Sequence, residues 1–131
     1  MGFAGRAATP LATDHPWAAL GLVAGPAAFV TGWVVGGGRT PGYSPVHDAI
    51  SRIAAVGAPE RTTMTTALVA YGASVLVGST ALRTSPLRRV WPLAAINGAA
   101  TIAVAALPLE RSSAMDVWHG VAAGTGYVSI A

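Results

Sequence analysis

The sequence predicts an all-α integral membrane protein: a helix bundle with four transmembrane helices and one short amphipathic helix at the membrane interface. Composition is the first reason. The 131 residues are 53% hydrophobic and only 10% charged, whereas an average soluble domain has roughly 25% charged residues. Pattern is the second reason, because the hydrophobic residues form long uncharged runs, each near the roughly 20 helical residues that cross a bilayer. We expect one transmembrane domain over residues 16–131, after a short disordered lead over residues 1–15.

The charged residues exclude several function classes. The chain has no cysteine, so it has no disulfide, no thiolate nucleophile and no thiolate metal ligand. Its eight basic residues are all Arg and give a net charge of +3 at pH 7. They are scattered along the chain and do not form the clustered basic surface of a nucleic-acid-binding protein. We therefore expect the lipid bilayer as a partner, and neither nucleic acid nor a cofactor.

The first span is predicted at residues 17–37, a run without a charge. Trp17 and Trp33 lie near its two ends, where aromatic residues anchor a helix at the membrane interface. Pro26 lies mid-span and should kink the helix, because proline removes one backbone hydrogen bond. Three consecutive glycines at residues 36–38 are expected to end the helix.

Small residues spaced four apart on this span predict close helix packing. Gly21 and Gly25 form one such pair, and Gly32 and Gly36 form a second. This spacing lets another helix approach closely. A helix–helix oligomer through these faces is therefore one partner that the sequence suggests.

The polar segment that follows is predicted to contain a short helix over residues 45–56. Ser44 is expected to cap this helix and Pro45 to occupy its first turn. The segment is too short to cross a bilayer. Its helical spacing is amphipathic, with an apolar face of Val46, Ile50, Ile53 and Ala54 and a polar face of His47, Asp48, Ser51, Arg52 and Ala55. Such a helix would lie in the interface or over the mouth of the bundle.

The remaining spans are predicted at residues 62–82, 90–107 and 117–131. Asn97 lies near the middle of the third span, where we expect it to hydrogen-bond across a helix interface rather than to bind a ligand. His119 falls in the first turn of the fourth span. That span is still apolar at Ala131 and shows no cap, so we expect the chain to be a fragment of a longer membrane protein.

Alternating spans determine which loops share a side of the membrane. The loops at residues 39–61 and 108–116 lie on one side, and the loop containing Arg83, Arg88 and Arg89 lies on the other. Three Arg without a neighbouring acid favour the cytoplasmic side. We expect a multi-pass protein of the cell membrane with a cytoplasmic N-terminus and with the two polar loops outside.

The two outer loops bring titratable side chains to one side, and we predict a polar pocket there. Its ligand-binding residues would be Asp48, Ser51, Arg52, Glu110 and His119. The leading function is a non-enzymatic membrane protein whose pocket binds a small ligand, a lipid headgroup or a partner. A simpler alternative is a polar face that pairs with itself, because Asp48 and Arg52 have the four-residue spacing of a helical ion pair.

Two other function classes stay open. One is a membrane-embedded, metal-dependent hydrolase acting on lipid, with catalytic candidates His47, Asp48, Ser51 and His119. Zinc would need three protein ligands and a water. Since no local metal-binding spacing joins His47, Asp48 and His119, we expect no metal. The other class is a fragment of a secondary transporter, which requires a charged or broken helix at the midplane of the membrane. Pro26 and Asn97 are the only residues that indicate such a helix.

Two motifs carry a resemblance to a known family. The first has the form Y-S-x-x-x-D-x-I-S-x-L-x-A-x-G and is matched by Tyr43, Ser44, Asp48, Ile50, Ser51, Ala55 and Gly57. The second is a Pro-x-acid turn followed by a His at the head of the next helix, matched by Pro108, Glu110 and His119. With these motifs the chain resembles the bacterial and archaeal membrane proteins of the domain of unknown function 998 family, whose members commonly have Asp in place of Glu110.

The resemblance covers residues 17–131 and stops short of the family's full bundle of helices. It implies that Asp48, Ser51, Glu110 and His119 belong to one site. It implies no activity, because the family has none that is settled.

Overall fold

The computed structural model describes residues 16–131, and the lead predicted over residues 1–15 lies outside them. The described residues form four α-helices and two short 3₁₀ helices and contain no β-strand, which confirms the all-α fold class. The elements, in chain order, are η1 (Pro16–Leu20), α1 (Gly21–Arg39), η2 (Ile50–Ala54), α2 (Arg61–Leu82), α3 (Trp91–Ala106) and α4 (Ser113–Val128).

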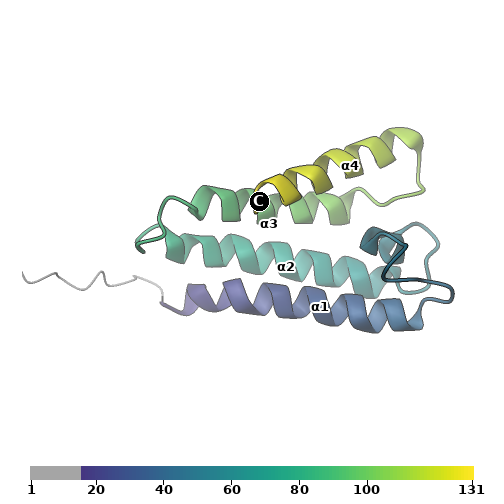
Figure 1. Ribbon diagram of the computed structural model, residues 1–131, viewed down its shortest axis with the longest axis horizontal. Coiled ribbons are helices and arrows are strands. Elements are labelled where there is room, and N and C mark those ends of the chain that lie inside the picture. Colours follow the sequence, from purple (N-terminus) through teal and green to yellow (C-terminus); the bar gives the residue numbers. More distant parts are fainter. Residues whose placement is uncertain (1–15) are drawn as a thin grey trace, which may run out of the picture.

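The four α-helices run up and down in chain order. Figure 1 shows α2 and α3 in the middle of the bundle, with α1 on one side and α4, tilted, on the other. Each helix packs against its neighbours in the sequence, and α1 and α4 do not pack against each other within the described chain. One flank of the bundle is therefore left open between α1 and α4.

The loop at residues 40–60 and the loop at residues 107–112 lie at the same end of the bundle, here named the loop end (Figure 1). The Val56 N–H donates to the Leu109 carbonyl oxygen at 3.0 Å, which joins the two loops directly. The turn at residues 83–90 lies at the opposite end (Figure 1). The grouping of loops that the sequence predicted is therefore correct.

Glycine lets the first three helices approach closely. Gly32 on α1 faces Ala67 on α2 so closely that a Cβ atom at position 32 would collide with the Ala67 side chain. A Cβ atom at Gly72 on α2 would lie 2.5 Å from the carbonyl oxygen of Gly98 on α3. The small-residue face of α1 thus packs against α2 of the same chain, and an oligomer through that face stays an untested prediction.

Asn97 connects three helices from a buried position on α3. Its Oδ1 accepts a hydrogen bond from the Tyr71 hydroxyl on α2 at 2.6 Å, and its Nδ2 donates to the Gly126 carbonyl oxygen on α4 at 3.0 Å. Asn97 is 5% exposed. The prediction that it bonds across helix interfaces is confirmed.

Much of the surface along the helices is apolar. The stretches Trp17–Arg39 and Arg61–Leu82 are long and apolar enough to cross a membrane, and Trp91–Ala106 is a shorter apolar helix. Large exposed apolar side chains include Val23, Val34, Val69, Val77, Leu93, Ile96, Val117 and Trp118. A contiguous apolar surface marks contact with lipid or protein, so these features suggest a membrane protein.

The boundaries of the first and last helices differ from the predicted ones. The first helix continues through the three glycines at residues 36–38 and ends at Arg39, because glycine lowers helix propensity without forbidding a helix. The last helix begins at Ser113, four residues earlier than the predicted start at residue 117, and it ends at Val128, before the predicted end at residue 131. The Ser112 side chain accepts a hydrogen bond from the Met115 N–H at 3.2 Å and so caps this helix. His119 consequently lies in its second turn.

Candidate functional site

The segment predicted as an amphipathic helix over residues 45–56 is wrong in its extent. Only Ile50–Ala54 is helical, and it is a 3₁₀ helix; residues 45–47 form a turn. The faces also differ, because Val46 is 82% exposed and Ala55 only 3% exposed. Ala49, with φ −66° and ψ 141°, is extended and separates the turn from the helix.

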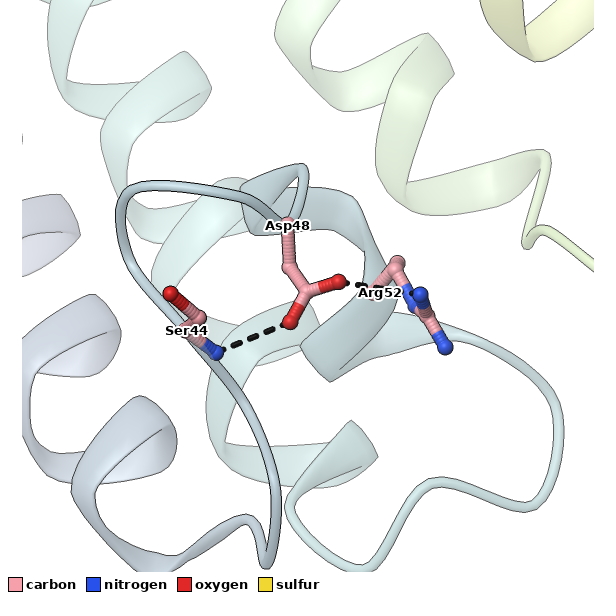
Figure 2. Close-up of polar contacts among 3 residues, drawn as sticks. All are labelled: Ser44, Asp48 and Arg52. Atoms are coloured by element: carbon pink, nitrogen blue, oxygen red, sulfur yellow. Dashed lines mark hydrogen bonds and ion pairs between the residues drawn. The ribbon is translucent and has the colours of Figure 1, made fainter.

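Asp48 closes the turn that precedes this break. Its Oδ2 accepts a hydrogen bond from the Ser44 N–H at 2.8 Å, and its Oδ1 accepts one from Arg52 at 2.9 Å. Figure 2 shows the carboxylate between these two donors. Ser44 does not act as the predicted N-cap, because residues 45–47 form only a turn and the helix begins at Ile50.

Apolar contacts fix the segment to the bundle. Ile53 is fully buried and packs in one cluster with Met64 and Leu68 of α2. The Trp33 indole N–H donates to the Tyr43 hydroxyl oxygen at 3.0 Å, which holds the start of the segment against α1. The segment that carries Asp48 and Arg52 is therefore held against α1 and α2.

The second loop presents Glu110 in an unusual backbone conformation. Glu110 has a φ of 66°, in the left-handed region that non-glycine residues seldom adopt. Its N–H donates to Oδ1 of Asp116, in the first turn of α4, at 2.9 Å. The preceding residue, Leu109, accepts the bond from Val56. Bonds on both sides therefore hold Glu110 in place, while its own side chain is exposed.

Three of the five predicted ligand-binding residues line one cavity. This cavity, named here the loop-end pocket, has a volume of about 300 Å³ and is lined by Asp48, Arg52, Glu110 and residues 40–43 and 55–59. The Arg52 side chain is 60% exposed and is paired with Asp48. Among the described residues no ion pair joins Arg52 to Glu110, although both line the pocket.

The other two predicted residues, Ser51 and His119, line a different cavity. This cavity, named here the side groove, has a volume of about 360 Å³ and runs between α1 and α4 over α2 and α3. His119 is 6% exposed, and its Nδ1 donates to the Leu107 carbonyl oxygen at 2.6 Å. The 3₁₀ helix lies between the two cavities, because Ser51 lines the side groove and Arg52 lines the loop-end pocket.

The residues proposed for catalysis do not form one cluster. His47 is exposed and lines neither cavity. Within residues 16–131 no group of three or more His, Asp or Glu side chains is placed to hold a metal ion, so His47, Asp48 and His119 do not form a zinc site. Ser51 and His119 share the side groove, and none of the hydrogen bonds in the described chain joins them.

Sequence reasoning missed the part that α1 and α2 play in the side groove. Pro26, Phe29 and Tyr71 line it together with Asn97, and the rings of Phe29 and Tyr71 lie 5.6 Å apart between centroids. One signal was present in the sequence. A tyrosine inside an apolar run carries a hydroxyl that needs a partner, and Asn97 is the polar side chain at matching depth.

A comparison with protein families finds one match. The family described as "Protein of unknown function (DUF998)" matches residues 23–131, which include all four α-helices and both cavities apart from the first residues of α1. No curated protein and no solved structure gives a significant match.

Proposed function

The chain belongs to the DUF998 family of proteins of unknown function, and we propose that it is an integral membrane protein whose loop-end pocket binds a small zwitterionic group. The ligand carries a positive charge and a phosphate or carboxylate. Phosphoethanolamine has this chemistry, whether it belongs to a lipid headgroup or to a free small molecule.

Placement in the membrane is supported by the apolar helices. Trp17–Arg39 and Arg61–Leu82 are each long enough to cross the hydrocarbon core of a bilayer. We propose a multi-pass arrangement in the cell membrane with a cytoplasmic N-terminus. Arg83, Arg88 and Arg89 then lie on the cytoplasmic side, and the loop-end pocket faces outward.

One observation carries the binding proposal: Arg52 and Glu110 have opposite charges, line one pocket and do not pair with each other. Both oxygens of the Asp48 carboxylate already accept hydrogen bonds, one from the Ser44 N–H and one from Arg52. Arg52 has five N–H donors, so it can keep this bond and still bind an anion. The Glu110 carboxylate makes no ion pair within the described chain. A ligand with both charges would bridge Arg52 and Glu110.

The pocket has the size for such a ligand. A volume of about 300 Å³ lies at the lower end of the roughly 300–1,000 Å³ of small-molecule sites. Neither the lipid hydrolase nor the transporter fragment has a comparable observation in its favour, so binding is the function that we propose.

The test uses the full chain purified in a neutral detergent and isothermal titration calorimetry. Glycerophosphoethanolamine is the soluble probe, and nanodiscs of phosphatidylethanolamine or phosphatidylglycerol are the lipid probes. Binding of the soluble probe indicates a free ligand. Binding only to phosphatidylethanolamine nanodiscs indicates a lipid headgroup.

Variants decide whether the loop-end pocket is responsible. Glu110→Gln and Arg52→Gln should each weaken binding about tenfold or more, the effect of one lost charged contact. Arg111→Gln is the matched control, because Arg111 is exposed in the same loop and does not line the pocket. No binding of any probe, or equal binding by Glu110→Gln and wild type, would overturn the proposal.

A further inference from the structure

The side groove is distinct from the loop-end pocket and has different chemistry. None of its lining residues is Asp, Glu, Lys or Arg. Its walls are apolar side chains of α1 and α4, among them Phe29, Val30 and Ala123. Polar side chains line it at Ser51 and His119. An apolar groove with a few uncharged polar groups is complementary to an amphiphile without a charge.

His119 supplies the most specific feature of the groove. A carbonyl oxygen can only accept a hydrogen bond, so the Nδ1 beside the Leu107 oxygen carries the hydrogen. In this tautomer Nε2 keeps a lone pair. Among the described residues no buried side-chain nitrogen or oxygen lacks a partner, and His119 makes no second hydrogen bond. Nε2 is therefore accessible, and the side groove is the cavity that His119 lines.

Tyr71, Asn97 and Thr101 are polar lining residues that already bond within the bundle, whereas the hydroxyls of Ser51 and Tyr127 make no hydrogen bond within the described chain. Tyr71 donates to Asn97, and Thr101 donates to the Asn97 carbonyl oxygen. An acceptor on His119 and a hydroxyl on Ser51 together match a ligand hydroxyl, which can donate to the first and accept from the second.

We infer that the side groove binds a lipid whose polar group is an uncharged hydroxyl, of the diacylglycerol or long-chain alcohol type. The hydroxyl bonds Nε2 of His119 and the hydroxyl of Ser51. The hydrocarbon lies between α1 and α4 against Phe29 and Ala123. An ionised phosphate is excluded, because burying it without a cationic partner is costly.

The test measures binding of a fluorescent dioleoylglycerol to the full chain in neutral detergent, with phosphatidic acid as the charged competitor. Dioleoylglycerol should bind at one per chain, and phosphatidic acid should compete at least tenfold more weakly. Ala123→Leu places a larger side chain in the groove and should abolish binding. Ser51→Ala should weaken binding about tenfold, which corresponds to one hydrogen bond. The matched control is Val121→Leu, because Val121 is 52% exposed on α4 and does not line the groove.

Other outcomes overturn the inference. If phosphatidic acid binds as tightly as dioleoylglycerol, or if Ala123→Leu and Ser51→Ala leave dioleoylglycerol binding unchanged, the result contradicts the inference. A dimer that forms without lipid and is lost in Ala123→Leu would show that a second copy occupies the groove instead. Melting curves of each variant show whether it is folded. Glu110→Gln should leave dioleoylglycerol binding intact, so this inference and the loop-end pocket can fail separately.

Discussion

Tyr71 donates a hydrogen bond from its hydroxyl to Oδ1 of Asn97 at 2.6 Å, across the interface between α2 and α3. Asn97 also donates a hydrogen bond from its Nδ2 to the Gly126 carbonyl oxygen on α4. Three of the four α-helices therefore meet at one buried amide. Since α4 packs on α3 and not on α1, the amide also determines where one wall of the side groove lies.

Asn97→Leu should lower the free energy of unfolding by about 1–3 kcal/mol, because it leaves the Tyr71 hydroxyl without its acceptor and removes the bond that joins α3 to the Gly126 carbonyl oxygen. That oxygen keeps the Ser129 hydroxyl as a donor. Chemical unfolding in detergent micelles measures the loss. Thr80→Val is the control: Thr80 is exposed and bonds only within its own helix, so its effect should be under about 0.5 kcal/mol. Equal stability of Asn97→Leu and wild type would contradict the assigned role.

Gly32→Ala should destabilise the bundle by roughly 1–3 kcal/mol, because the new methyl group collides with Ala67 and separates α1 from α2. Gly38→Ala is the matched control on the same helix. A Cβ atom there meets nothing within 4 Å, and Ala favours helix over Gly, so this variant should gain up to about 1 kcal/mol. Thermal unfolding of the two variants should therefore shift in opposite directions.

Glu110→Gly should raise stability by up to about 1 kcal/mol, because glycine adopts the positive φ of this position without strain. The same change removes the carboxylate and should abolish binding of glycerophosphoethanolamine. Glu110→Gln keeps the strained backbone, so it should show the weakened binding without the gain in stability. If Glu110→Gly melts at a lower temperature than Glu110→Gln, the strain argument is wrong.

Asp48→Ala should cost about 1–2 kcal/mol, mostly through the lost bond to the Ser44 N–H. Arg52→Ala should cost less than about 1 kcal/mol, because its ion pair with Asp48 is exposed to solvent. Unfolding titrations of the two variants compare these losses directly. A larger loss for Arg52→Ala would show that the ion pair, rather than the turn, stabilises the segment.

The sequence predicted the helices well, because long uncharged runs are compatible with few other structures. The predicted spans at residues 62–82 and 90–107 lie within a residue of α2 and α3 at each end. The partner of Asn97 was not predictable in detail, since it depends on the depth of Tyr71 on a neighbouring helix. The general role of Asn97 was predictable, because a buried amide must bond across a helix interface.

The candidate site was predictable only in part. Asp48, Arg52 and Glu110 meet in one pocket because two loops share an end of the bundle. Ser51 and His119 line the other cavity. Helical periodicity placed Ser51 beside Asp48 on one face, and it failed because Ala49 is extended and separates the turn at residues 45–47 from the 3₁₀ helix that begins at Ile50. A pattern of residue types does not reveal a single extended residue within an otherwise helical spacing.

The measurement that tests the central claim most directly is a calorimetric comparison of glycerophosphoethanolamine with its two halves, ethanolamine and glycerol 3-phosphate. If Arg52 and Glu110 each hold one charge of the ligand, the whole molecule should bind at least tenfold more tightly than either half. In Glu110→Gln the advantage over glycerol 3-phosphate should disappear. Equal affinity of wild type for the whole molecule and for one half would show that the loop-end pocket is not a zwitterion site.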